Sequence, residues 1–90
     1  MEDNTQKHKD FVSGPMEDKL VTALPGIGEE LGQKLAIHGY KKAYKVLAKL
    51  LVLEKDAQKF KDWLRDDMGA NDEQAYLCHN ALWVWCDTFL

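Results

Sequence analysis

The stretch from Pro25 to Gly28 combines residue types that could bind an anion. Proline and glycine are costly inside a helix, so this stretch predicts a tight turn between two helical segments. Gly26 and Gly28 have no side chain and would leave backbone amides open at the start of a helix, where the helix dipole favours negative charge. A phosphate group fits this chemistry, and Lys34 lies close enough along the chain to contact a neighbouring phosphate.

Apolar residues on both sides of this turn predict the two elements that hold it, from about Asp18 to Ile37. The apolar face before the turn consists of Leu20, Val21 and Leu24, and the one after it of Ile27, Leu31 and Leu35. Ile27 is therefore predicted to plug the space between two helices, and Gly39 to end the second. The pattern is typical of the helix-hairpin-helix motif, which holds DNA by its backbone without reading bases. A corner that serves packing alone is the alternative interpretation.

Catalytic residues are not arranged suggestively in this sequence. Ser13 is the only serine, and the adjacent carboxylates Asp66 and Asp67 would point in different directions on a helix. Acid, base and nucleophile nowhere have a spacing that indicates catalysis. The sequence therefore predicts a protein that is not an enzyme.

The cysteines and histidines do not have the spacing of a zinc site. Cys78 and His79 are neighbours, which diverge by about 100° around a helix. Cys78 and Cys86 would lie about 12 Å apart along one helix, too far for a disulfide between them. We expect free, buried thiols, no metal and no other cofactor.

Length and composition predict a single domain over residues 1–90. Apolar residues make up 46% of the chain and charged residues 30%, as in an ordinary globular protein. We expect an intracellular protein without membrane insertion, because no apolar run approaches the roughly 20 residues that cross a bilayer. The net charge of −3 hides a basic middle, residues 34–61, and an acidic segment, residues 62–73.

Four further helices are predicted. The first spans about Thr5 to Val12, capped by Asn4 or Thr5, with Phe11, Val12 and Met16 as packing anchors. The second spans Lys41 to about Leu53 and carries a row of lysines that could contact nucleic acid or simply face solvent. The others start at the caps Asp56, with an end near Gly69, and Asn71, which has Gln74 three residues later.

The last of these helices is predicted to run almost to Leu90 and to be apolar around most of its circumference. Its predicted inward stripe consists of Ala75, Cys78, Leu82, Trp85 and Phe89. Outside the stripe, Tyr76 and Trp83 project on one side, and Leu77 and Val84 on the other. This pattern indicates that a partner chain covers part of the helix, although neighbouring helices of the same chain could cover both flanks.

Along essentially its full length, the chain resembles the barrier-to-autointegration factor family of small animal chromatin proteins. Several separated blocks carry the resemblance: Gln6-Lys7-His8, Asp10-Phe11-Val12, Pro15-Met16, Gly26-Ile27-Gly28, Lys42-Ala43-Tyr44, Leu51-Val52-Leu53, Trp63-Leu64, Gly69-Ala70-Asn71, Trp85-Cys86-Asp87 and Phe89-Leu90. The resemblance implies an all-α, compact five-helix domain of the SAM-like bundle type, containing one helix-hairpin-helix motif and forming a homodimer.

The resemblance also implies a function. Family members bind double-stranded DNA without sequence preference, bridge DNA molecules in chromatin, and bind LEM-domain proteins of the nuclear envelope, lamin A and histones. We therefore expect the protein in the nucleus, at chromatin and the nuclear envelope, and in the cytoplasm. Matching positions suggest DNA contacts at Gln6, Lys7, Gly26, Ile27, Gly28, Leu31 and Lys34, and a LEM-domain pocket at Phe11, Val52 and Trp63.

Several positions depart from the family pattern. Two basic DNA contacts of the family fall on Glu73 and Tyr76, and a lysine of the hairpin helix falls on Gln33; each change weakens phosphate binding. The family's phosphorylated N-terminal hydroxyl cluster is reduced to Thr5. In the LEM-domain pocket, a leucine falls on Lys59 and a lysine on Glu54.

Two hypotheses follow. The first is a DNA-bridging homodimer of chromatin and the nuclear envelope. The second is a diverged paralogue with weakened DNA binding, which acts as a protein-interaction or hetero-dimerising regulatory subunit through an extra interface at Tyr76, Trp83 and Val84.

Overall fold

The computed structural model describes residues 2–90, which form five α-helices and one short 3-10 helix around a single hydrophobic core. The elements are α1 (Glu2–Val12), η1 (Val21–Ala23), α2 (Glu29–Ile37), α3 (Ala43–Val52), α4 (Ala57–Asp66) and α5 (Asp72–Phe89). The predicted all-α, five-helix architecture is confirmed. Within the described residues, no helix is long and apolar enough to cross a membrane.

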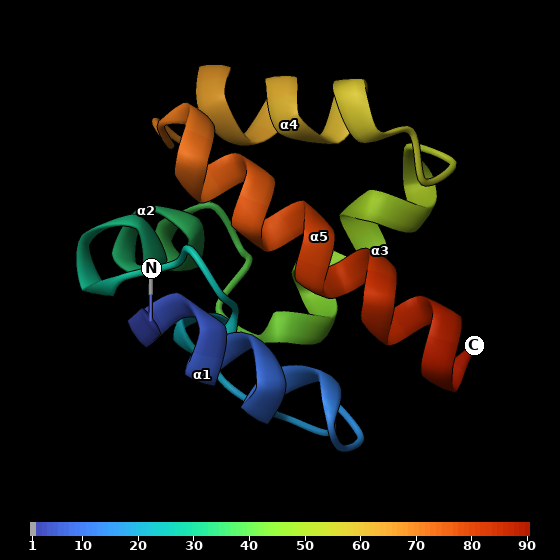
Figure 1. Cartoon of the computed structure of the whole chain (residues 1–90). Coiled ribbons are helices and arrows are strands. Elements are labelled where there is room, and N and C mark those ends of the chain that lie inside the picture. Colours follow the sequence, from blue (N-terminus) through green and yellow to red (C-terminus); the bar gives the residue numbers. More distant parts are fainter. Residues whose placement is uncertain (1) are drawn as a thin grey trace.

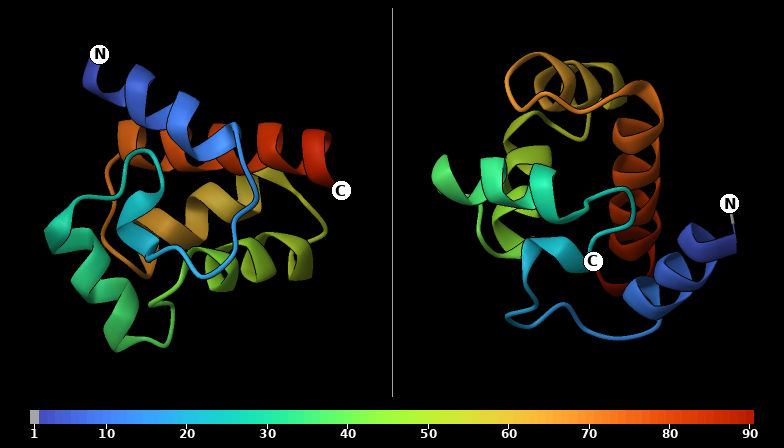
Figure 2. Two further views of the ribbon diagram at one scale, coloured as in Figure 1. Left: turned by 90° about the horizontal axis from the view of Figure 1, so that it is seen from below. Right: turned by 90° about the vertical axis from the view of Figure 1, so that its left-hand side faces the viewer.

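The longest helix, α5, is the element on which the others pack (Figure 1). It contacts both α1 and α4, and Figure 2 shows α1 side by side with α5. Ala75, Cys78 and Leu82 are fully buried, as predicted for the inward stripe. Phe89 was wrongly placed in that stripe: it is 39% exposed, because the last turn of α5 extends beyond the other helices, and its ring stacks on Trp85 at 5.0 Å.

The first helix is longer than predicted. α1 begins at Glu2, so Asn4 and Thr5 lie within the helix and do not cap it. Packing of α1 against α5 outweighs the local capping preference of these residues. The predicted anchors Phe11 and Met16 are buried, at 1% and 3% exposure.

The element before the hairpin is a single 3-10 turn rather than the predicted helix from about Asp18. Leu24 is extended, at φ −71° and ψ 133°, because the residue before a proline avoids the helical region. At the other end, the amide of Val21 donates to Lys41 O at 2.8 Å, and Leu20 forms an isolated bridge with Lys42. Both ends of the segment are therefore held in extended conformation, which leaves room for one turn only.

Three predicted helix boundaries further along the chain are confirmed by their caps, whereas α3 begins two residues after the predicted Lys41 and α4 ends at Asp66, before the predicted Gly69. Asp56 accepts from the amide of Lys59 at 2.9 Å. Asn71 and Gln74 form the reciprocal capping box, with both hydrogen bonds at 2.8 Å. Gly39 follows α2 at φ +94° and donates to Ala36 O.

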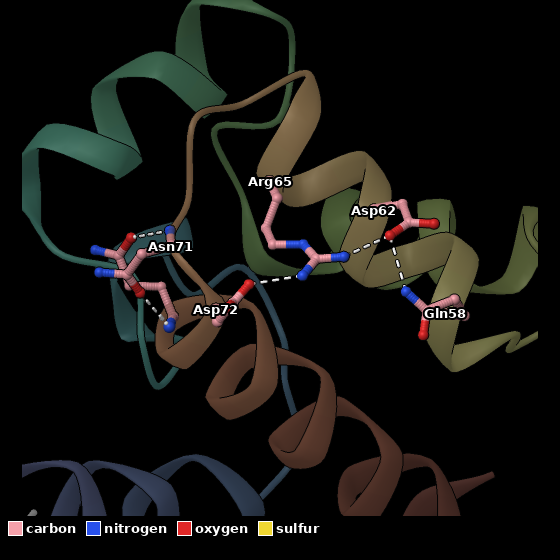
Figure 3. Close-up of polar contacts among 6 residues, drawn as sticks. Gln58, Asp62, Arg65, Asn71 and Asp72 are labelled. Carbon is pink, nitrogen blue, oxygen red and sulfur yellow. Dashed lines mark hydrogen bonds and ion pairs between the residues drawn. The ribbon is translucent and has the colours of Figure 1, made fainter.

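An ion-pair network joins α4 to the start of α5 (Figure 3). The guanidinium of Arg65 donates to Asp72 at 2.6 Å and to Asp62 at 2.5 Å, and Gln58 donates to Asp62 at 2.9 Å. Hydrogen bonds from Gln58 and Arg65 lower the pKa of the Asp62 carboxyl. The network holds the first turn of α5, which borders the predicted hairpin, against α4.

Both cysteines are free and buried, as predicted. Burial raises the pKa of the Cys78 thiol to about 12, so this thiol is protonated at neutral pH. Within residues 2–90, no group of three or more histidine, cysteine or acidic side chains could hold a metal ion.

His79 on α5 makes the stability of the fold sensitive to pH. Its ring lies between Phe60 and Trp83, at centroid distances of 5.9 and 5.7 Å, and its Nε2 is buried without a partner among the described residues. Burial, with a smaller contribution from Lys61, lowers the pKa of His79 below the ordinary value of 6.5. The unfolded chain therefore binds a proton more readily than the folded chain as the pH falls.

We expect the free energy of unfolding to decrease as the pH falls through 6.5 toward the lower pKa of His79 in the folded state. His79→Phe should remove this part of the pH dependence, because phenylalanine keeps an aromatic ring and cannot titrate. Urea unfolding at neutral and mildly acidic pH measures the effect. An equal decrease in both proteins would show that His79 is not responsible.

Candidate nucleic-acid interface

The start of α2 offers a row of open backbone amides. Gly28 is the exposed N-cap residue, and no side chain caps this end of the helix. The first amide with a backbone acceptor is that of Gly32, which donates to Gly28 O at 2.8 Å; for residues 28–31, no amide hydrogen bond to the described chain is found. An ideal Cβ built on Gly28 meets no atom within 4 Å. The predicted opening at the helix N-terminus is therefore present at Gly28.

Gly26, by contrast, is half-buried and packs closely against α5, although it also borders a hollow beside Gly28. It has φ +84°, and a Cβ at this position would lie 2.6 Å from the backbone oxygen of Gln74 and 3.1 Å from Cβ of Leu77. The hairpin is thus closed against the first turns of α5. The sequence analysis singled out Gly26 as an open amide, whereas the structure requires a glycine there because the backbone packs against α5. Residues near Gly26 in the sequence do not reveal this contact.

Gly26→Ala should destabilise the protein by more than about 1 kcal/mol, because alanine is strained at positive φ and its Cβ would clash with the α5 backbone. Chemical denaturation measures the change. Gly28→Ala, where the added Cβ meets open space, is the matched control and should leave stability nearly unchanged. Equal stability of the two variants would contradict this account of the hairpin.

Lys7 connects α1 to the hairpin. Its Nζ donates to the carbonyl of Ile27 at 2.8 Å. Burial lowers the pKa of Lys7, an effect opposed by nearby Cys78. The ammonium is therefore adjacent to the predicted site but is partly used to fix α1 to the turn.

Two polar hollows flank Gly28. One, of about 340 Å³, is lined by residues of α2 with Gly69 and Gln74, and includes Lys34. The other, of about 300 Å³, lies between the hairpin, Lys7 and the first turns of α5. A Cβ on Gly69 would lie 3.0 Å from Nζ of Lys34, so the Lys34 ammonium lies over the turn before α5. The structure brings the amides of Gly28 and both predicted lysines around one surface.

Carboxylates weaken the positive potential of this surface. Glu29 and Glu30 line the first hollow with Lys34, and Glu73 lines the second with Lys7. Each hollow thus contains one ammonium and at least one carboxylate. Attraction for a phosphate depends mainly on the open amides and the α2 dipole, and Glu73 opposes it.

The remaining predicted DNA contacts differ in exposure. Ile27 is fully buried, which confirms it as the plug, and Leu31 is 5% exposed, so both could offer only backbone atoms. Gln6 is exposed and its side-chain amide donates to Asp10 at 2.9 Å. It lies one residue before Lys7 on α1 and does not line either hollow.

The predicted LEM-domain pocket is only partly on the surface. Val52 is 74% exposed at the end of α3. Phe11 is buried in the core, and Trp63 is 9% exposed, with its ring packed on Tyr40 at 5.0 Å and under Lys49. For Phe11, the packing interpretation is therefore the one that the structure supports.

The predicted extra interface on α5 is exposed at two of its three residues. Tyr76 is 56% and Trp83 46% exposed. Val84 is half-buried on the other flank of the helix, so it does not belong to the same surface. Neighbouring elements thus cover one flank of α5 and leave the other open.

The lining of the two hollows includes residues that sequence reasoning did not assign to the site. Asn71 and Gln74 were predicted only as a capping pair, yet they line the hollows beside Gly28, as does Gly69. The capping pattern predicted where α5 begins along the chain, but it did not indicate that the start of α5 lies beside the hairpin in space.

Comparison with known proteins identifies relatives over the whole described fold. Residues 2–89 match the family model described as Barrier to autointegration factor. The chain is 52% identical to the barrier-to-autointegration factor of Danio rerio over 90 residues, covering 100% of both chains. It is 52% identical to the Homo sapiens protein over 86 residues, 96% of this chain and 97% of the relative, and 48% identical to the Drosophila melanogaster protein over 90 residues, 100% of both.

Proposed function

Because the chain belongs to the barrier-to-autointegration factor family, we propose that it is a chromatin protein that binds double-stranded DNA through the phosphate backbone, without reading bases. The observation that carries the proposal is the row of open amides at Gly28, bordered by Lys34 and Lys7. Amides and ammonium groups bind phosphate oxygens, which are the same at every base pair. We expect no catalytic activity.

The proposal includes a homodimer that bridges two duplexes. One hairpin makes few phosphate contacts, whereas two hairpins in a dimer could each hold a duplex. Two exposed apolar side chains on one side of α3 support self-association: Tyr44 is 44% and Leu51 42% exposed. Large exposed apolar patches commonly mark protein interfaces.

Leu51→Glu should convert the dimer to single chains, because it places a charge in an apolar contact. Mass measured by light scattering tests this expectation. Ile37→Glu places the same charge at an exposed apolar residue of α2 and should leave the mass unchanged. A single-chain mass for the natural protein would contradict the homodimer.

The family resemblance extends the proposal to partners and location. We propose binding to LEM-domain proteins, lamin and histones, and localisation to chromatin, the nuclear envelope and the cytoplasm. Val52, with its side chain open to solvent, is the residue of the predicted pocket that supports LEM-domain binding most directly.

Duplex binding as a function of salt concentration tests the proposed DNA binding. The proposal expects equal affinity for duplexes of unrelated sequence and a linear decrease of log affinity with log salt, with a slope of about −0.9 for each phosphate contact. Affinity that depends on sequence, or that does not respond to salt, would refute it.

A second candidate function is a regulatory subunit that pairs with another chain and binds DNA weakly. Glu73 in the hollow beside Lys7 and the exposed ring of Tyr76 favour it, since both replace basic contacts expected from the family. If the protein is folded but shows no salt-sensitive binding to a DNA duplex, this second candidate is favoured over the first.

A further inference from the structure

Gly69, in the turn between α4 and α5, borders the hollow that Gly28 and Lys34 also line. Its φ of +83° is one reason for a glycine at this position. Its amide donates to Arg65 O at 3.1 Å, so the turn closes the carboxyl end of α4. A Cβ at position 69 would lie 3.0 Å from Nζ and 3.9 Å from Cδ of Lys34, and apart from its chain neighbours it would meet no other described residue within 4 Å. The Lys34 side chain therefore occupies the space that a side chain at position 69 would need.

The Lys34 ammonium does not form the ion pair that its place on α2 offers. Glu30 lies four residues before Lys34, the spacing at which a glutamate and a lysine pair most favourably on a helix. Both ion pairs found among residues 2–90 nevertheless belong to Arg65. The Lys34 side chain extends instead over the turn after α4, where the dipole of that helix favours a positive charge. The ammonium therefore stays available to a phosphate in the hollow.

We propose that Gly69 is a positioning residue for phosphate binding. Because it has no side chain, the Lys34 ammonium can lie over the turn and border the same hollow as the open amides of Gly28. The inference rests on the proposed DNA binding and adds to it a residue that acts through Lys34. A side chain at position 69 would displace the ammonium, which could then pair with Glu30.

The placement of Lys34 affects binding in two ways. A long side chain loses rotamer freedom when it is fixed, and a lysine that already extends over the turn loses less of it than one that moves freely in solvent. An ammonium paired with Glu30 would also have to leave that carboxylate before it contacts a phosphate. Both effects predict weaker binding and a smaller salt dependence when position 69 carries a side chain.

Gly69→Asn tests the proposal, because asparagine adopts positive φ more readily than most residues with a side chain. It should reduce the affinity for a generic DNA duplex by about three- to tenfold and flatten the slope of log affinity against log salt by about 0.9, as expected for one lost phosphate contact. Gly39→Asn is the matched control: Gly39 also follows a helix, at φ +94°, but a Cβ there meets no atom within 4 Å. Its affinity should stay unchanged. Fluorescence anisotropy measures binding, and circular dichroism checks that both variants are folded.

A double-mutant cycle with Lys34→Met shows whether Gly69 acts through Lys34. Methionine keeps an unbranched side chain and removes the charge, so Lys34→Met should weaken binding at least as much as Gly69→Asn. The chain with both changes should bind no more weakly than Lys34→Met alone. Additive losses would overturn the proposal. So would unchanged binding by Gly69→Asn, or an equal loss in Gly39→Asn.

Nuclear magnetic resonance of the free protein tests the placement of Lys34 without DNA. The natural protein should show nuclear Overhauser effects between the terminal methylene protons of Lys34 and the α protons of Gly69, and Gly69→Asn should lose them. Their absence from the natural protein would overturn the positioning role even if the protein binds DNA. Their presence in a protein that binds no duplex would support the placement of Lys34 and contradict the proposed DNA binding.

Discussion

Gly28→Glu should reduce the affinity for a generic DNA duplex by about ten- to a hundredfold without unfolding the protein. The new side chain meets no atom within 4 Å of its Cβ, so the fold accommodates it. Its carboxylate would stand in front of the open amides at the start of α2 and compete with the phosphate. Hydrogen bonds to a charged group contribute about 1.5–3 kcal/mol each, which corresponds to that loss.

Two matched variants distinguish this effect from a general change of charge. Gly28→Gln adds the same bulk without charge and should lose far less affinity. Gly14→Glu adds the same charge at another glycine whose Cβ would meet open space, and should bind nearly as the natural protein does. Fluorescence anisotropy with a labelled duplex measures all three. If Gly28→Glu and Gly14→Glu bound the duplex equally well, the start of α2 would not be the DNA-binding site.

Glu73→Lys should strengthen duplex binding by about tenfold at low salt. Glu73 lines the hollow beside Lys7 and Gly28, where a carboxylate repels phosphate and an ammonium could contact it. One additional contact should steepen the slope of log affinity against log salt by about 0.9. The lost interaction of Glu73 with the α5 dipole costs about 0.3–1 kcal/mol of stability, which the fold tolerates.

Glu54→Lys is the control for this gain. It changes the net charge by the same amount at an exposed position in the turn between α3 and α4, away from the hairpin. Its binding should change only slightly, with no steeper salt dependence. If both variants gain equally, net charge rather than the position of Glu73 determines the affinity.

Most helix boundaries were predictable because their signals are local. Asp56, Gly39 and the pair Asn71 and Gln74 each act within a few residues of the chain. The segment before the hairpin was predicted wrongly: Pro25 marks its extended end locally, but its other end depends on a hydrogen bond from Val21 to Lys41, 20 residues away. The spacing of apolar residues indicates which side chains face the core, but it does not indicate hydrogen bonds between residues far apart in the sequence.

The site was predictable in its residue types and less so in its arrangement. Gly28 and Lys34 line the same hollow at the start of α2, and their role in phosphate binding stays a prediction. The packing of Gly26 on Gln74 and the bond from Lys7 to Ile27 O involve elements far apart in sequence, so neither could be read from spacing. Phe11 was expected to contact a partner but is buried in the core, and the spacing of residues in the sequence could not show this either.

Co-capture of two duplexes tests the central claim most directly. One duplex is fixed to beads, and a second, labelled duplex of unrelated sequence is added with the protein. The account predicts that the natural protein retains the labelled duplex on the beads, that Gly28→Glu does not, and that rising salt releases it. A protein that binds each duplex alone but never retains the second would contradict bridging, and one that binds neither would contradict the phosphate site itself.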